Sequence, residues 1–136
     1  MCTDGLARDF IGSNYFYTDN FKHSKIETAL IEHLFRNRQS DTQVSGDGTV
    51  LQLLRDDTIG SQHQRFIIEL KSGHTILVAH NIDIAPKVLH LKNGDNIGFS
   101  GEYEWTPQGG VLHWTHKDPD DIHPSGYLRH NDTVYQ

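Results

Sequence analysis

Cysteine is almost absent from this sequence. The single cysteine, Cys2, excludes an internal disulfide and any zinc site built on cysteine sulfur. Cys2 has two interpretations. It can be a free thiol on a terminal tail, or, because it directly follows Met1, the acylated first residue of a mature lipoprotein whose export signal was replaced by a start methionine.

Long hydrophobic runs are also missing, so we expect no transmembrane segment. The chain lacks a Gly-x-x-x-x-Gly-Lys phosphate loop, a Gly-x-Gly-x-x-Gly fingerprint and a Gly-x-Ser-x-Gly nucleophile elbow, which removes the main motif-based classes of nucleotide-binding protein and serine hydrolase. What is present, 136 residues with 35% hydrophobic and 22% charged, is typical of one globular domain.

Positive charge is scarce. Twelve basic residues against eighteen acidic ones give a net charge of −6, which disfavours non-specific binding to nucleic acid and to anionic membranes. Ten histidines would change that balance on acidification, since protonating all of them brings the net charge to −6 + 10 = +4.

The first 23 residues have no hydrophobic period and are predicted to be an N-terminal extension, although aromatic residues are frequent in them. Residues 24–136 are predicted to form a single domain. Ser24 and Glu27 have the spacing of a capping box, and apolar residues at helical spacing follow, so we expect an amphipathic helix at residues 25–38.

After the helix, short strands separated by glycine-rich turns are expected. Their predicted ranges are 49–54, 63–70, 75–80, 97–105 and 111–116, with a further short element at 127–130. The clearest alternation is in 97–105, where one face is apolar and the other is polar. The apolar face should cover the core, and the polar face should meet water. These elements predict a mostly β fold, a small five- to six-stranded OB-like barrel at residues 44–136 preceded by one α-helix.

Four strings in the sequence are distinctive: HQRFI at 63–67, AHNIDIAP at 79–86, GEYEW at 101–105 and HWTHKDP at 113–119. Through them, residues 42–136 resemble a family of small bacterial proteins of unknown function that are often exported. The resemblance implies a periplasmic or lipid-anchored location and no established activity. This chain departs from it because no signal peptide is visible, which leaves a cytoplasmic location open, and because Lys117 stands where the family often has histidine.

Histidine and aspartate gather near the C-terminus, where a divalent metal site is one interpretation. Its candidate ligands are His116, Asp118 and His123, joined by His63, and the expected cofactor is zinc or another divalent metal. His116 and Asp118 would share a face if their strand continued that far. The same pair can instead be a general base with its orienting carboxylate, or can simply fasten the turn at Asp118-Pro119.

Four other residues are candidates for ligand binding: Arg65, His80, Trp114 and Tyr127. An arginine fork suits a phosphate or carboxylate, and Trp114 and Tyr127 can stack on bases or sugars. The alternative for Arg65 is an ion pair with Asp57 or Glu69. The paired carboxylates Glu102 and Glu104 are interpreted as an ordinary solvated strand face.

Two functions follow from these observations. The first is a non-enzymatic OB-like binding module for an unidentified small molecule, saccharide, peptide or protein, with nucleic acid disfavoured by the charge. The alternative is a metal-dependent hydrolase or nuclease with a His/Asp site. The sequence shows no motif specific enough to choose an enzyme.

Overall fold

The computed structural model of the chain describes residues 27–136. The described part starts with a helix at residues 27–36 and continues as seven β-strands. These are β1 (Thr42–Leu53), β2 (His63–Glu69), β3 (Thr75–Asn81), β4 (Asn96–Glu104), β5 (Val111–His113), β6 (Tyr127–His130) and β7 (Thr133–Tyr135). The interpretations of Cys2, the N-terminal extension and the capping serine at position 24 lie outside the described residues.

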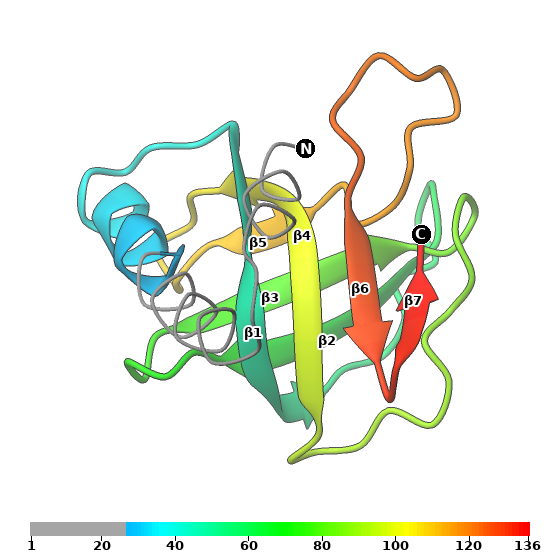
Figure 1. Ribbon diagram of the computed structural model, residues 1–136, viewed down its shortest axis with the longest axis horizontal. Helices are drawn as coiled ribbons and strands as arrows, with labels where there is room; N and C mark the ends of the chain where they lie inside the picture. Colours follow the sequence, from blue (N-terminus) through cyan, green and yellow to red (C-terminus); the bar gives the residue numbers. More distant parts are fainter. Residues whose placement is uncertain (1–26) are drawn as a thin grey trace, which may run out of the picture.

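Five strands form a closed barrel in the order β1-β2-β3-β5-β4, and β4 pairs again with β1 (Figure 1). All the pairings are antiparallel except β3 with β5, which are parallel. Closure removes the open edges that so short a sheet would otherwise expose. The predicted OB-like barrel is confirmed, and β6 and β7 are two outer strands beyond it.

β1 is longer than predicted because it runs through the glycines at 46 and 48 instead of starting after them. Its first part pairs with β4 and its last part with β2, with a register shift between Val50 and Gln52. A bulge of this kind bends one strand across two neighbours. Neither glycine has a positive φ. A Cβ on Gly48 would lie 3.1 Å from Ile68, so this glycine serves the close approach of β1 and β2.

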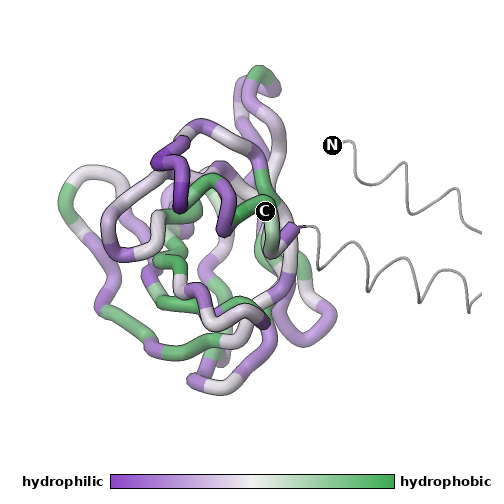
Figure 2. Tube along the Cα trace, turned by 90° about the vertical axis from the view of Figure 1, so that its left-hand side faces the viewer, coloured by the Kyte–Doolittle hydropathy of each residue, from purple (hydrophilic) through white to green (hydrophobic). Residues whose placement is uncertain are grey.

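The barrel interior follows the predicted alternation. The buried side chains of β2, β3 and β4 include Phe66, Ile68, Ile76, Val78, Phe99 and Tyr103. Figure 2 shows the chain wound around a common centre, with several of the hydrophobic segments (green) close to that centre. This closed core is the rigid scaffold from which the outward-facing side chains project.

The two ends of the barrel are covered differently. The helix lies beside one end, where Ile31 and Leu34 are buried and the Trp105 indole N–H donates to the carbonyl of Phe35 at 3.0 Å. Segment 82–95, which contains no helix, covers the other side (Figure 1). There the Gln64 side-chain amide donates to the carbonyl of Val88 at 3.1 Å and accepts from its N–H at 2.9 Å.

The outer strands extend the edge of β4 that the short β5 leaves free. β6 pairs with residues 98–100 of β4, while β5 pairs with residues 102–104. The β6–β7 turn at Asn131 and Asp132 has φ values of 50° and 67°, as a two-residue type I′ hairpin requires. Between β5 and β6, residues 114–126 form the loop that projects at the top of Figure 1, here called the β5–β6 loop. No helix among the described residues is long and apolar enough to cross a lipid bilayer.

A candidate metal centre on the outer face of the barrel

Glu102, Glu104 and His113 lie together on the outside of the barrel, and we call them the carboxylate–histidine cluster. The two glutamates alternate with buried Tyr103 on β4, so both point outward. The register of the β4–β5 pair places His113 directly opposite Glu102. Side chains opposite each other in an antiparallel pair are close neighbours.

The cluster is compact. His113 Nε2 lies 3.3 Å from Glu104 Oε2 and 3.7 Å from Glu102 Oε2. One possible ligand atom from each of the three residues lies within 4.8 Å of the other two. The side chains are 16% (Glu102), 36% (Glu104) and 32% (His113) exposed, so the expected open, solvated strand face is wrong for Glu102. The β5–β6 loop lies beside it and restricts its access to water.

His123 comes from the β5–β6 loop and contacts the other oxygen of Glu102. Its Nε2 faces Glu102 Oε1, and its Nδ1 lies 2.8 Å from the carbonyl oxygen of Pro124. Because both partners are acceptors, both ring nitrogens carry protons in this arrangement. Partial burial opposes the charge, but the Glu102 carboxylate and the Pro124 carbonyl raise the pKa of His123 above its ordinary value.

Trp114 sets the direction of the chain at the start of the β5–β6 loop. Its φ of 56° ends β5 directly after His113, and a bulky residue in this region is strained. The indole stacks on the ring of His123, with centroids 3.9 Å apart and planes at 11°. Strand alternation therefore does not continue to His116 and Asp118, and their expected shared face is absent.

Asp118 fixes the turn inside the loop. Its Oδ2 accepts from the backbone N–H of His123 at 2.7 Å and of Ile122 at 3.0 Å, and its Oδ1 accepts from Asp120 at 2.9 Å. These hydrogen bonds lower the pKa of Asp118. The carboxylate thus fastens the turn, one of the alternatives that the sequence left open.

Negative charge is concentrated at the cluster. Partial burial, with the neighbouring carboxyl groups of Asp41 and Glu102, raises the pKa of Glu104, and His113 opposes this shift only in part. A carboxylate with a raised pKa is one whose charge is poorly compensated. The arrangement is therefore suited to receive a cation.

Among the described residues, the four predicted metal ligands do not form a common ligand set, and Asp118 contacts His123 through the backbone N–H of His123. His116 is buried, with Nδ1 2.7 Å from the carbonyl of Lys117, and His63 Nδ1 lies 3.0 Å from the carbonyl of Ser61. Within the described part of the chain, the group of three or more possible ligands that comes together is Glu102, Glu104 and His113. Of the predicted four, His123 reaches it, through Glu102.

The predicted ligand-binding residues are also dispersed. His80 is fully buried, and both its ring nitrogens are engaged: Nε2 lies 2.9 Å from the carbonyl of Pro86 and Nδ1 2.7 Å from the Thr115 hydroxyl. Burial lowers the pKa of His80 to about 4, and nearby His116 and His63 contribute in the same direction. Trp114 borders the cluster, Tyr127 is half-buried on β6, and Arg65 lies on β2.

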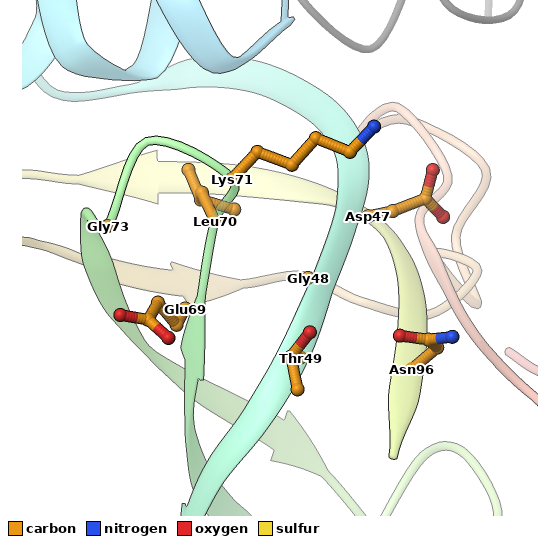
Figure 3. A pocket seen from close by; sticks show the side chains of 8 residues that line it. All are labelled: Asp47, Gly48, Thr49, Glu69, Leu70, Lys71, Gly73 and Asn96. Atoms are coloured by element: carbon orange, nitrogen blue, oxygen red, sulfur yellow. The ribbon is translucent and has the colours of Figure 1, made fainter. Parts of the chain in front are cut away.

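A separate hollow of about 340 Å³ lies between β1 and the β2–β3 turn (Figure 3). Figure 3 shows Lys71 extending across it toward the side of Asp47, with Thr49, Glu69 and Asn96 around it. None of the metal ligands or ligand-binding residues predicted from the sequence lines it. Its lining carries charges of both signs, and among the described residues no group of three possible metal ligands meets there.

Residues 17–136 match the model of a protein family of unknown function, DUF3465. The chain belongs to this family. The resemblance inferred from the sequence is thereby confirmed for most of the length of this DUF3465 protein. No curated protein matches it. The family's description names no activity.

One signal for the cluster of this DUF3465 protein is present in the sequence and lies outside any of its short motifs. Residues 105–110 are a turn, so folding strands β4 and β5 back on each other pairs position 104 with 111 and position 102 with 113. That register alone places His113 against the two glutamates. The histidine–aspartate spacing indicates His116 and Asp118 as metal ligands instead.

Proposed function

We propose that this protein is a non-enzymatic binding module whose ligand is a divalent transition-metal ion, held by Glu102, Glu104 and His113. The observation that carries the proposal is the meeting of three possible ligand atoms within 4.8 Å. One imidazole with carboxylate oxygens is a ligand set suited to zinc and neighbouring first-row ions.

The spacing agrees with that chemistry. Zinc–ligand bonds of about 2.1 Å in tetrahedral geometry place adjacent ligand atoms about 3.4 Å apart. His113 Nε2 lies 3.3 Å and 3.7 Å from the nearest oxygens of Glu104 and Glu102. Only small side-chain adjustments are needed for a cation to lie between the three.

The scaffold supports the same assignment. Both glutamates and the histidine belong to paired strands of a closed barrel, whose backbone positions are fixed by the β4–β5 register. Ligands on strands are held more precisely than ligands on loops. The crowded carboxyl groups around Glu104 would be relieved by a bound cation, which gives the ion a favourable electrostatic term.

The test is zinc titration of tag-free, full-length protein by calorimetry. We expect one site per chain with micromolar or tighter affinity. Glu102→Gln, Glu104→Gln and His113→Ala should each weaken zinc binding at least about tenfold, a loss of about 1.4 kcal/mol. Matched controls are Glu69→Gln and His33→Ala, which alter exposed residues away from the cluster and should leave the affinity unchanged.

Two results would refute the proposal. One is zinc binding that survives all three cluster substitutions. The other is zinc binding that is lost in variants of the sequence-predicted set, His116→Ala, His63→Ala or Asp118→Asn, while the cluster variants bind normally.

A metal-dependent hydrolase is the second candidate, and one observation favours it. Three protein ligands leave a coordination position open, as catalytic zinc sites do, and His113 and Glu104 are partly exposed. The net charge of −6 makes nucleic acid the less suitable substrate. Zinc-dependent hydrolysis of activated phosphate or carboxylate esters, abolished by EDTA and by His113→Ala, would establish the enzyme; its absence from zinc-loaded protein leaves the binding module.

A further inference from the structure

A second, independent hollow opens beside Arg65, which we call the Arg65 pocket. It has a volume of about 250 Å³ and lies between the end of β1, the outer face of β2 and residues 87–91. It shares no residue with the carboxylate–histidine cluster. Its apolar wall consists of Leu53, Leu54, Val88 and Leu91.

The charges in this pocket do not cancel. Lys87 is paired with Asp56, with 2.7 Å between Nζ and Oδ2. Arg65 uses its Nε–H on the carbonyl of Arg55 at 3.0 Å, and no carboxylate of the described residues lies within ion-pair distance of it. The alternative ion pair of Arg65 with Asp57 or Glu69 is therefore absent, and the Asp57 carboxylate instead accepts from the N–H of Ile59.

Arg65 is thus a half-buried guanidinium with no counter-ion among residues 27–136, on a protein of net charge −6. The terminal nitrogens of an arginine present a planar fork that matches the two oxygens of a carboxylate. A carboxylate that binds there would form charge-assisted hydrogen bonds with this fork and neutralise its charge.

The opposite wall is held in place before any ligand arrives. The two hydrogen bonds between the buried Gln64 amide and Val88 fix residues 87–91 against β2. Leu91 is also buried, whereas Leu53 is 44% exposed at the pocket mouth. An apolar wall next to an uncompensated cation suits a ligand that has both an apolar part and a negative charge.

We propose that the Arg65 pocket binds a small amphipathic carboxylate. Its head pairs with the Arg65 guanidinium and its short apolar body lies on the accessible side chains of Leu53 and Leu54. A hollow of about 250 Å³ lies at the small end of ligand pockets, so it suits a ligand of a few carbon atoms. Hexanoate has this size and chemistry and is the probe for the test.

The experiment is an NMR titration of the full-length protein with hexanoate, in EDTA so that the metal site plays no part. Hexanoate should shift the amide signals of Arg65, Val88 and Leu91 and saturate at millimolar concentration. Hexanamide has the same shape without the charge and should bind at least about tenfold more weakly. Arg65→Gln should weaken hexanoate binding by a similar factor, while Arg129→Gln, which removes an exposed arginine elsewhere, should not.

The spectrum and melting temperature of Arg65→Gln report whether the variant is folded. If it is not, Lys87→Gln serves as the second variant, and a lowered hexanoate affinity there supports the proposal. The proposal is overturned if hexanoate shifts none of the three signals, if hexanamide binds equally well, or if inorganic phosphate at the same concentration reproduces the shifts. The last result would identify an anion site without an apolar component.

Discussion

Glu102 lies between two histidines and addresses one carboxylate oxygen to each. Its Oε2 is 3.7 Å from His113 Nε2 on the neighbouring strand, and its Oε1 contacts His123 Nε2 from the β5–β6 loop. The first relationship is fixed by strand register and the second by a loop that Trp114 and Asp118 hold in place. A strand site and a loop therefore meet at one carboxylate.

Glu104→Gln should have opposite effects on stability and on metal binding. Because the folded protein raises the pKa of Glu104, ionisation of this side chain works against folding, and stability is lost as pH rises through the raised pKa. The isosteric amide removes that charge, so the metal-free variant should melt above wild type at neutral pH. The stabilisation that zinc adds to wild type should be smaller in the variant, because the variant binds zinc more weakly.

Differential scanning calorimetry with EDTA and with zinc measures both effects. If Glu104 and His113 instead form a structural ion pair, Glu104→Gln melts below wild type in EDTA, which contradicts the account.

His80 should make the fold sensitive to acid. The Pro86 carbonyl can only accept, so Nε2 carries the proton and Nδ1 accepts from Thr115. The unfolded chain takes up a proton near pH 6.5, whereas folded His80 does so only at about 4. Stability from this residue is therefore complete above pH 6.5 and is lost between 6.5 and about 4, with a total of about 3 kcal/mol.

Urea unfolding across that pH range measures the loss, with His80→Gln as the variant that cannot titrate. The difference between the two stabilities should shrink as pH falls. In the wild type, the His80 ring signals should keep the neutral tautomer until the pH approaches 4. Titration near 6.5 would contradict the buried, doubly bonded ring.

Gln64→Ala should loosen the cover of the barrel. The substitution leaves the buried N–H and carbonyl of Val88 without partners, at a cost of about 2–4 kcal/mol. Gln52→Ala, at an exposed position of β1, should change stability by less than about 0.5 kcal/mol. Chemical denaturation compares the two variants. Equal free energies of unfolding would show that the Gln64 amide does not hold residues 87–91 in place.

Gly126→Ala should displace the β5–β6 loop. A Cβ there would lie 2.1 Å from the carbonyl oxygen of Trp114 and 2.4 Å from that of Ser100, both backbone atoms. We expect a loss of about 1–3 kcal/mol and changed NMR signals for Trp114 and His123. Gly46→Ala is the control, because its closest contact is the Phe99 side chain at 3.2 Å, which can shift. Unchanged loop signals in Gly126→Ala would contradict the packing described.

Local patterns in the sequence predicted much of the fold. The alternation of β2 and β4 identified their buried faces, and the element predicted at 127–130 is β6. The start of β1 was missed because glycines usually mark turns, whereas Gly48 here provides room against Ile68. β5 was predicted too long because nothing in the sequence signals that Trp114 adopts a positive φ.

The candidate site was harder to predict because it depends on pairing between strands. Glu102 and Glu104 look like a solvated face until the β5–β6 loop is placed beside them. Their relation to His113 is readable only from the register of the hairpin. Asp118 looked like a metal ligand, but its oxygens are used by three backbone N–H groups. The functions of His116, His63 and Tyr127 stay predictions.

The central claim is that a metal ion binds between Glu102, Glu104 and His113. Zinc-soaked crystals of the tag-free protein, with anomalous diffraction at the zinc edge, test it most directly. The account predicts one strong anomalous peak within about 2.1 Å of His113 Nε2 and of an oxygen from each glutamate. A fully soaked crystal with no peak there, or with its strongest peak at His116, Asp118 or His63, would contradict it.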